Sequence, residues 1–347
     1  MRVGIDARKL ADFGIGTYIR GLLGGLMELG TGDEYVAFAP ADARLPDGVE
    51  HVAVDAPHYS VRELLAVGSA ADRAGLDVFH APHYVVPFTK VPVVVTIHDL
   101  IHLHQPLRNP FARVYARMMI GRAVKTARVV LTVTEAVKGQ LERELGARNV
   151  RVTPNGVVLP GSTGSQPVAG RAESPALQRE RFFLYVGNDK PHKNVGTAVE
   201  AAKLASVRLV LAGAPFERFD GVEKRGFVSD EELSSLYAEA IALVMPSLEE
   251  GFGLPALEAM AHGTAVITSR DPALVEITGD AALHVDARDA AGLAEAMRRI
   301  ANDASLRADL GAKGLERARL FTWKRCAEAT RKGYEEARNR GTSWNVG

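Results

Sequence analysis

Two glutamates on either side of a glycine-rich turn are the strongest chemical signal in this sequence. Glu250 directly precedes Gly251-Phe-Gly253, and Glu258 follows after Pro255. Glycines let backbone N–H groups come close to a ligand, and proline suits the first turn of a helix. A helix that begins at this turn directs its positive end at an anion. We therefore predict a phosphate-binding turn with one acid in the loop and one inside the helix. A surface loop followed by a solvated glutamate is the alternative.

A second glycine turn carries two lysines. After the apolar run Phe182–Val186 the chain continues as Gly187-Asn-Asp-Lys-Pro-His-Lys-Asn, with Lys190 and Lys193 close to an expected helix start. Lysines in this position suit a diphosphate, although an ordinary loop with solvated lysines has the same composition. Because ligands bind beyond the carboxyl ends of parallel strands, we expect this turn and the Glu250 turn to reach the same crevice.

The first half of the chain has a glycine pair after its first expected strand. Gly14 and Gly16 could admit a diphosphate to backbone N–H groups, but a plain strand-to-helix turn explains them equally well. The third glycine of a dinucleotide fingerprint would fall at Ile19, so a dehydrogenase is disfavoured.

His98 is the first residue after the apolar run Val91–Ile97 and is the side chain of its loop best placed to enter a cleft. With Asp99, His102 and His104 it forms a string of residue types that bind zinc or iron. One strand-end loop does not present all four side chains in one geometry. We therefore predict one site residue, His98, and no metal site.

The composition is that of a globular protein with about two domains. The chain has 347 residues, of which 47% are hydrophobic. Its 42 basic and 42 acidic side chains give a formal net charge of zero, so no general attraction to nucleic acid is expected. Cys326 is the only cysteine, which excludes an internal disulfide. We see no signal segment and no apolar run near the roughly 18 residues that cross a bilayer, so we expect a cytoplasmic protein.

Short β-branched runs alternate with helical segments, which predicts an α/β fold with parallel sheets. The stretch from Pro160 to about Pro175 is rich in Gly, Ser and Pro and separates two such series. Two Rossmann-like domains with a cleft between them are therefore expected. The predicted strands are Val3–Asp6, Tyr35–Phe38, Val49–Val54, Val78–His80, Val91–Ile97 and Val129–Thr134, then Phe182–Val186, Arg208–Ala212, Ala242–Met245, Ala265–Thr268 and Ala282–Val285.

Several motifs, taken in order, resemble the retaining family-4 glycosyltransferases of the GT-B fold, and the match runs over nearly the whole chain. The motifs are Gly14-Ile-Gly-Thr-Tyr, Ile97-His-Asp-Leu, Pro154-Asn-Gly, Tyr185-Val-Gly-Asn, Pro191-His-Lys-Asn, Gly226-Phe-Val-Ser-Asp-Glu-Glu-Leu and Pro246-Ser-Leu-Glu-Glu-Gly-Phe-Gly-Leu-Pro with Glu258. The block around the two glutamates is the specific one. The resemblance implies an N-terminal acceptor-side domain over 1–165, a nucleotide-sugar domain over 175–322, and a C-terminal helix over 323–347 that packs back on the first domain.

The resemblance also implies roles for individual residues. The catalytic set is His98 near the reacting centre, Lys193 on the diphosphate and Glu250 at the donor sugar. Glu258 would hold the ribose, the backbone around Phe252, Gly253 and Leu254 the sugar and phosphate, and that around Phe227 and Val228 the base. Gly14 and Gly16 would approach the diphosphate from the other domain. Many relatives carry arginine where this chain has Asn188, so Lys193 would bear more of the charge, with Lys190 as a substitute.

The sequence has no Asp-x-Asp pair of the kind that holds a metal against the diphosphate in other transferases. Preorganised cations and helix-end amides can stabilise the leaving diphosphate instead. The retaining mechanism implied by the resemblance is better fitted by front-face departure and attack than by a nucleophilic Glu250.

A basic segment over 108–128 contains no acidic residue. Apolar side chains alternate with the basic ones in a helical pattern, which suits a helix lying on an anionic membrane. A helix with its apolar stripe in the core and solvated arginines is the alternative. The basic residues are Arg108, Arg113, Arg117, Arg122, Lys125 and Arg128, interleaved with Phe111, Val114, Tyr115, Met118, Met119 and Ile120.

We therefore expect a retaining glycosyltransferase without a cofactor that moves a hexose, mannose first, to a glycan or lipid-linked acceptor of cell-surface polysaccharide or glycolipid synthesis. GDP-mannose is the first expectation for the donor and a UDP-sugar the second. Peripheral attachment to the inner membrane face is left open. A sugar-nucleotide epimerase or hydrolase of the same fold, or a non-catalytic sugar-nucleotide-binding protein, are the alternatives.

Overall fold

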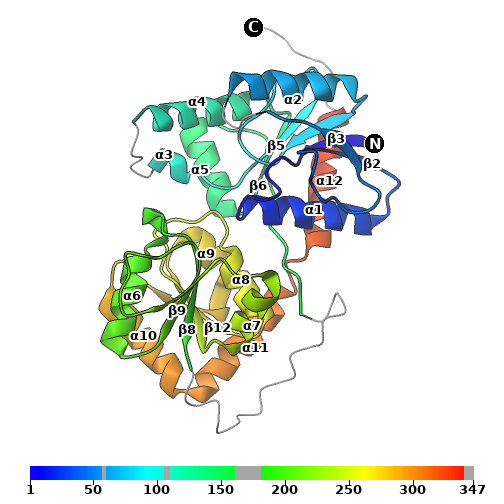
Figure 1. The fold of residues 1–347 in the computed structure, drawn as a ribbon. Coiled ribbons are helices and arrows are strands. Elements are labelled where there is room, and N and C mark those ends of the chain that lie inside the picture. Colours follow the sequence, from blue (N-terminus) through cyan, green and yellow to red (C-terminus); the bar gives the residue numbers. More distant parts are fainter. Residues whose placement is uncertain (57–59, 105–109, 161–180, 340–347) are drawn as a thin grey trace. The chain divides into compact units, whose positions relative to one another are not determined.

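The computed structural model describes residues 1–56, 60–104, 110–160 and 181–339. Contacts divide the chain into two compact units (Figure 1). Unit 1 is Met1–Gly156 with Trp323–Gly347, and unit 2 is Val157–Thr322. Beyond Pro160, the predicted linker lies outside the described residues.

Unit 1 is built on a seven-stranded parallel sheet in the order β3-β2-β1-β4-β5-β6-β7. Its strands are β1 (Arg2–Asp6), β2 (Glu34–Ala39), β3 (Glu50–Ala53), β4 (Val78–Ala81), β5 (Val93–Ile97), β6 (Val129–Thr132) and β7 (Val150–Val152). Its helices are α1 (Ile15–Leu29), α2 (Val61–Arg73), α3 (Ile101–His104), α4 (Pro110–Thr126), α5 (Glu135–Leu145) and α12 (Trp323–Asn339).

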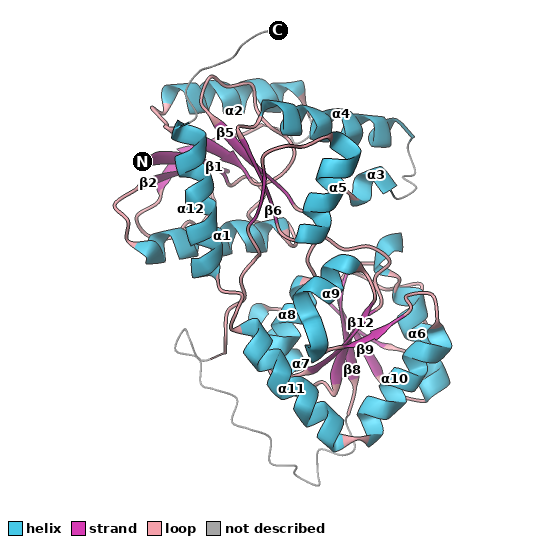
Figure 2. Ribbon diagram, turned by 180° about the vertical axis from the view of Figure 1, so that it is seen from behind, coloured by secondary structure: helices cyan, strands magenta, loops and turns pink. Residues whose placement is uncertain are grey.

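Two apolar layers cover this sheet, one on each face. The layer that α1 and α12 form includes Leu22, Ala327 and Tyr334. The opposite layer draws on α2, α4 and α5. Helices α1 and α12 pack very closely, since a Cβ added at Gly21 or Gly25 would meet Trp323 atoms at 2.2 or 2.4 Å. Glycines at these positions therefore fix the C-terminal helix against the first one (Figure 2).

Unit 2 has a six-stranded parallel sheet in the order β10-β9-β8-β11-β12-β13. Its strands are β8 (Phe183–Gly187), β9 (Leu209–Gly213), β10 (Glu223–Gly226), β11 (Ala242–Met245), β12 (Ala265–Ser269) and β13 (Leu283–Val285). Its helices are α6 (Val195–Ala205), α7 (Asp230–Glu239), α8 (Leu254–Ala261), α9 (Pro272–Thr278), α10 (Ala290–Asn302) and α11 (Ala304–Ala318), with short 3₁₀ turns η2 at Pro191–Lys193 and η3 at Gly279–Ala281.

Both sheets follow the Rossmann order, so the predicted fold of two Rossmann-like α/β domains is confirmed. In each sheet the strand order reverses once, between β1 and β4 in unit 1 and between β8 and β11 in unit 2. Ligands of such sheets bind at the carboxyl ends of the strands next to this reversal. A ligand site is therefore expected at the loops after β8 and β11.

Two edge strands, β7 and β10, were not predicted from the sequence. Both are short and carry charged residues, Arg151 in β7 and Glu223, Lys224 and Arg225 in β10. Charged, short edge strands protect a sheet against pairing with other chains, but they lack the apolar run that identifies an inner strand. Among the helices of the described ranges, none is both long enough and apolar enough to cross a membrane.

Candidate active site

Lys193 and Glu250 form an ion pair at the strand reversal of unit 2. Lys193 ends the 3₁₀ turn after β8, and Glu250 lies in the loop after the neighbouring strand β11. The Lys193 Nζ atom donates to both carboxylate oxygens of Glu250, at 2.7 and 2.9 Å. The side chains are 18% and 7% exposed. The structure thus brings the two predicted catalytic residues of this unit into direct contact, in a place where charge is only partly hydrated.

Asn194 ties together the loops that carry this pair. Its side-chain amide donates to the Pro246 carbonyl at 3.0 Å and to the Ala287 carbonyl at 2.6 Å. Its backbone is left-handed, with φ 55°. Asparagine tolerates this conformation better than most residues. Asn194 was not predicted as a site residue, although an asparagine directly after a lysine turn is a signal for such a bend.

The glycine-rich turn opens helix α8 as predicted. Gly253 is the N-cap with φ 95°, and Pro255 lies in the first turn. A Cβ at Gly253 would meet Leu274 Cδ2 at 2.5 Å, so both conformation and space require glycine here. The Phe252 ring is buried and packs edge-on against Phe321 at 6.0 Å. Only the backbone of Phe252 is therefore left for a ligand, as the prediction for Phe252, Gly253 and Leu254 requires.

Glu258 is partly buried on α8 and accepts a hydrogen bond from the Tyr237 hydroxyl at Oε2, at 2.7 Å. Burial raises the pKa of the Glu258 carboxyl, the Tyr237 hydrogen bond opposes this, and the charge of Asp230 adds to it. Burial also raises the pKa of Tyr237, so that this hydroxyl remains a donor. Tyr237 comes from α7 and was not predicted, because nothing local to Glu258 indicates which tyrosine would reach it.

Asp271 is a second unpredicted acid of this region. It caps α9, accepting from the backbone N–H groups of Ala273 and Leu274 at 3.0 and 3.2 Å. Burial raises the pKa of Asp271 to about 6, with the charge of Glu250 adding to the effect. Asp271 therefore lies within electrostatic reach of the Lys193–Glu250 pair. These two capping hydrogen bonds hold the start of α9 beside the Glu250 loop.

The other predicted donor-binding residues of unit 2 lie at strand ends. The Asn188 side chain accepts from the Lys190 backbone N–H at 3.1 Å, so it shapes its own loop, while the Lys190 side chain is exposed. Phe227 and Val228 follow β10, at the outer edge of the sheet, and the Phe227 side chain is 64% exposed. Donor binding by these four residues stays a prediction.

His98 follows β5 in unit 1 and is partly buried. Its Nε2 atom lies 3.0 Å from the Pro82 carbonyl oxygen. A carbonyl only accepts, so Nε2 carries the proton and Nδ1 of the neutral ring holds a lone pair. Burial lowers the pKa of His98, which favours this neutral form. Nδ1 can therefore accept a hydrogen bond from a substrate hydroxyl.

Gly14 and Gly16 open helix α1 of the same unit. Gly14 has a positive φ of 69° and free space where a Cβ would be. A Cβ at Gly16 would meet the Leu10 carbonyl oxygen at 2.4 Å, and the Gly16 N–H already donates to the Asp12 carbonyl at 2.9 Å. Tight packing of the preceding loop thus accounts for Gly16 without a ligand. Its approach to a diphosphate stays a prediction.

The remaining histidines of the His98 string have separate partners. His104 pairs with Glu144 at 2.9 Å, and the His102 ring lies 6.1 Å from that of Tyr84. In the part of the chain that the structure describes, no three histidine, cysteine, aspartate or glutamate side chains are placed to share a metal ion.

A buried charge network at the end of β1 was not predicted as part of any site. Arg8 contacts Asp6 at 2.6 Å and Glu63 of α2 at 2.8 Å, and His83 Nε2 lies 3.5 Å from Asp6. Burial opposes ionisation of Asp6, but the contacts of His83 and Arg8 outweigh it and lower the pKa of Asp6 well below its usual range. The signal was present in the sequence as Asp6-Ala-Arg8 at the end of an apolar strand. Its position beside the strand reversal of unit 1 became evident only in the structure.

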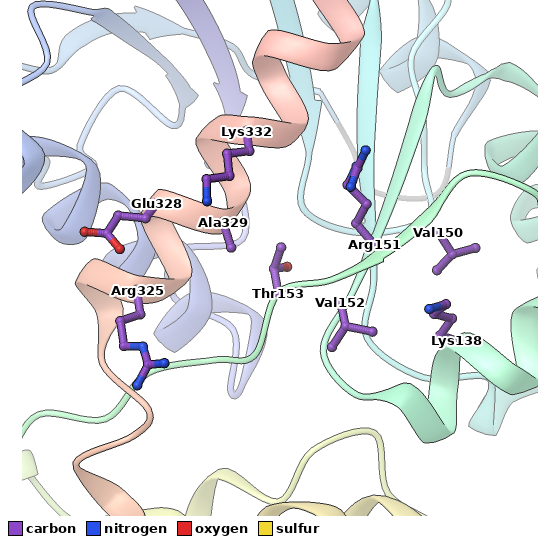
Figure 3. Close-up of a pocket in the computed structure, with 9 residues that line it drawn as sticks. All are labelled: Lys138, Val150, Arg151, Val152, Thr153, Arg325, Glu328, Ala329 and Lys332. Carbon is purple, nitrogen blue, oxygen red and sulfur yellow. The ribbon is translucent and has the colours of Figure 1, made fainter.

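A groove of about 360 Å³ in unit 1 is separate from all predicted site residues. It runs beside the edge strand β7, between α5 and α12 (Figure 3). Arg151 on that strand contacts Glu336, and Lys138 pairs with Glu135 at 3.1 Å. Charged side chains along an open strand edge discourage pairing with other chains, and this explains the composition of the groove. Its lining residues are Lys138, Val150, Arg151, Val152, Thr153, Arg325, Glu328, Ala329 and Lys332.

Comparison with known proteins assigns the two halves of the chain. Residues 14–159 match the family model described as Glycosyltransferase Family 4, and residues 170–317 match Glycosyl transferases group 1. The chain belongs to the family-4-type GT-B glycosyltransferases. O-antigen chain mannosyltransferase B of Escherichia coli is 28% identical to this glycosyltransferase in an alignment of 283 residues, with 74% of each chain covered.

Solved structures agree on the fold of this glycosyltransferase. Sucrose-phosphate synthase from Thermosynechococcus elongatus matches with a TM-score of 0.78 at 22% identity, over 97% of this chain and 98% of that one. Anabaena Alr3699/HepE, solved in complex with UDP-glucose, matches with a TM-score of 0.74 at 15% identity, over 96% and 99%. At these identities the likeness supports the GT-B fold alone. The predicted family, fold and enzyme class, a hexosyltransferase, are confirmed, and the epimerase, hydrolase and non-catalytic alternatives are not favoured.

Proposed function

We propose that this glycosyltransferase moves mannose, with retention, from GDP-mannose to a glycan or lipid-linked acceptor in surface polysaccharide or glycolipid synthesis. The observation that carries the proposal is the partly buried Lys193–Glu250 pair at the strand reversal of unit 2, close to the start of α8. The mannosyltransferase from Escherichia coli supports mannose as the sugar. A UDP-sugar is the second candidate donor, since GT-B glycosyltransferases use nucleotide sugars and HepE is solved with UDP-glucose.

In the proposed complex the Lys193 ammonium shares its charge between Glu250 and the donor diphosphate. Glu250 accepts hydrogen bonds from sugar hydroxyls, and Glu258 accepts them from the ribose. The backbone N–H groups at the start of α8 face the phosphates and the sugar. Negative charge grows on the diphosphate as the glycosidic bond breaks, and a fixed cation with oriented amides stabilises it without reorganisation. His98 Nδ1 accepts a hydrogen bond from a hydroxyl of the sugar. The acceptor hydroxyl attacks from the face that the diphosphate leaves, and its proton passes to the departing phosphate oxygen.

A thermal-shift screen tests the donor. A ligand that binds only the folded state raises its apparent stability in proportion to the logarithm of its concentration over Kd. We expect GDP-mannose to raise Tm more than UDP-, ADP- and dTDP-sugars at equal concentration. Incubation with donor alone should leave it largely intact over times in which added acceptor consumes it. Rapid consumption without acceptor, or a larger shift with a UDP-sugar, would contradict the mannosyl-transfer proposal or its donor.

We also propose that helix α4 attaches the enzyme to anionic membrane on the inner face. Its inward side is buried through Ala116, Met119, Ile120 and Ala123. Val114 and Met118 are 67% and 60% exposed, one turn apart, and Arg113 and Arg117 beside them are exposed too. Apolar side chains next to arginines on one exposed face suit a headgroup layer. Arg108 lies outside the described residues, as does the Phe111 side chain.

Arg122 does not belong to this exposed face. Its guanidinium donates to the Val86 and Pro87 carbonyls and lies 4.3 Å from the centre of the Phe88 ring. Replacing it would disturb unit 1 itself. A clean test of membrane binding therefore changes Arg113 and Arg117 and leaves Arg122 in place.

Liposome flotation tests the attachment. We expect binding to phosphatidylglycerol vesicles, little to phosphatidylcholine vesicles, and at least about tenfold weaker binding of the Arg113→Glu, Arg117→Glu variant, since each basic residue near an anionic surface contributes about 1 kcal/mol. A Met118→Ser change should weaken binding further. The control is Arg62→Glu with Arg143→Glu, two exposed arginines on α2 and α5. Equal loss in the control, or binding that ignores lipid charge, would count against a role for α4.

A further inference from the structure

A chain of buried hydrogen bonds joins α12, β4, β5 and α1 in unit 1. The Tyr334 hydroxyl lies 2.8 Å from His80 Nδ1, and His80 Nε2 lies 2.7 Å from Thr96 Oγ1. The same Thr96 oxygen lies 3.0 Å from the Tyr18 hydroxyl. All four side chains are 0% exposed. Buried polar groups are costly unless paired, so this chain specifies one arrangement of its members.

The four side chains of this hydrogen-bond chain are uncharged at physiological pH. The pKa of His80 is lowered to about 3, mainly by burial; the neighbouring imidazoles of His98 and His83 act in the same direction, and Asp6 opposes them. A neutral imidazole donates from one nitrogen and accepts at the other. Neutral His80 therefore donates to one of the Tyr334 and Thr96 hydroxyls and accepts from the other.

The chain of hydrogen bonds ends at Tyr18, whose ring contacts the ring of His98. The Tyr18 and His98 rings meet edge to face, with centroids 4.7 Å apart and planes at 78°. On another side the Tyr18 ring lies 6.4 Å from the Trp323 ring of α12. Tyr18 is therefore held by its hydroxyl and by a ring of α12.

His98 has two restraints in the described structure. One is the hydrogen bond from Nε2 to the Pro82 carbonyl, about which the ring can still tilt. The other is the edge-to-face contact with Tyr18, which blocks that tilt. The direction of the Nδ1 lone pair depends on both restraints together.

We propose that Tyr18 is a positioning residue for His98, and that α12 holds Tyr18 in place through the Tyr334–His80–Thr96 chain and through Trp323. This rests on the proposed contact of His98 with the donor sugar. In this proposal the C-terminal helix has a function besides packing. A substitution on α12 alters the orientation of His98, although α12 itself does not contact the substrate. If these residues only pack the core, substitutions should change the stability of the protein. They should change neither the orientation of the His98 ring nor kcat.

Three variants separate ring from hydroxyl. Tyr18→Leu removes the ring, Tyr18→Phe keeps the ring and removes the hydroxyl, and Tyr334→Phe cuts the chain at its far end. The matched control is Tyr35→Phe, because Tyr35 is a buried tyrosine of unit 1 whose hydroxyl is not bonded to any member of this hydrogen-bond chain. Each variant is assayed for kcat, donor KM and Tm, and the His98 ring nitrogens are followed by ¹⁵N NMR.

We expect Tyr18→Leu to lower kcat about tenfold and to change the His98 ring shifts, because loss of alignment acts on the bound complex. Donor KM should stay within about twofold. Tyr18→Phe and Tyr334→Phe should each lower kcat by about threefold, and their double variant should fall little further, since residues of one network are not additive. Tyr35→Phe should match the wild type.

Unchanged kcat and unchanged His98 shifts in Tyr18→Leu would overturn the proposal. So would losses of activity that follow only the fraction of unfolded protein, with the His98 spectrum intact. A His98→Ala variant decides the underlying role separately. If it transfers at the wild-type rate, the contact of His98 with the sugar is wrong, while the ring shifts in the Tyr18 variants still decide whether Tyr18 positions His98.

Discussion

Replacing Glu250 with glutamine is expected to lower kcat/KM for glycosyl transfer by about 100-fold, the magnitude seen when one preorganised group of an electrostatic site is removed. Glutamine keeps the shape of the side chain but loses the charge that holds Lys193 at 2.7 Å. The ammonium then shifts, and a donor sugar loses a strong acceptor. Steady-state assays with the best nucleotide sugar of the donor screen measure the effect.

The stability of the same variant separates a structural pair from a catalytic one. Removing one partner of a buried ion pair leaves the other charge uncompensated, so Glu250→Gln and Lys193→Met should each lower the free energy of unfolding. The double variant should recover part of that stability, because no charge is left unpaired. Activity should not recover, because both groups act on the donor. Recovery of activity together with stability would mean that the pair only supports the loops.

Glu249→Gln is the matched control for this experiment. It removes a carboxylate from the adjacent residue, which is more exposed than Glu250. We expect its kcat/KM to stay within about threefold of the wild type, as for a change outside the electrostatic site. Equal losses at Glu249 and Glu250 would argue that the loop as a whole, rather than the Glu250 carboxylate, is needed.

Glu258→Gln is expected to raise donor KM by about tenfold to 100-fold with a smaller change in kcat, since hydrogen bonds to a charged group contribute about 1.5–3 kcal/mol. Tyr237 occupies Oε2, and the ribose is proposed to bind the other oxygen. A contact made equally in the ground and transition states changes KM rather than kcat. Titration of donor analogues by calorimetry gives the binding change directly.

The pH dependence of donor KM follows from the raised pKa of Glu258. Only the ionised carboxylate accepts at both oxygens, and protonation begins at a higher pH than for an ordinary glutamate. Donor KM should therefore rise as pH falls through that raised pKa. Glu258→Gln should abolish this dependence, and Tyr237→Phe should move it to higher pH, because the Tyr237 hydrogen bond lowers the pKa. Glu239→Gln, an exposed acid of α7, should leave both KM and its pH dependence unchanged.

The inner strands and the start of α8 could be predicted because their signals are local. A buried parallel strand needs an apolar run, and a glycine with φ 95° followed by proline marks a helix start. The edge strands β7 and β10 were not predicted, because an edge strand tolerates charged residues and therefore lacks the apolar run of an inner strand. The partners of the site residues were not predicted either. Asn194, Tyr237 and Asp271 have their roles because they interact with carbonyls and carboxylates on other elements.

The sequence by itself determined the family, the two parallel sheets and the residue types of the site, since each depends on a short segment of backbone chemistry or on motifs in order. Tertiary structure alone decided that Lys193 meets Glu250 across 57 positions of sequence and that Tyr334 meets His80 across 254. Such contacts depend on which strands lie side by side at the reversal of each sheet and on where the last helix packs. These are set by the burial of whole faces. The strand ends predicted that the Lys193 and Glu250 turns share a crevice, but no local pattern records the individual contacts.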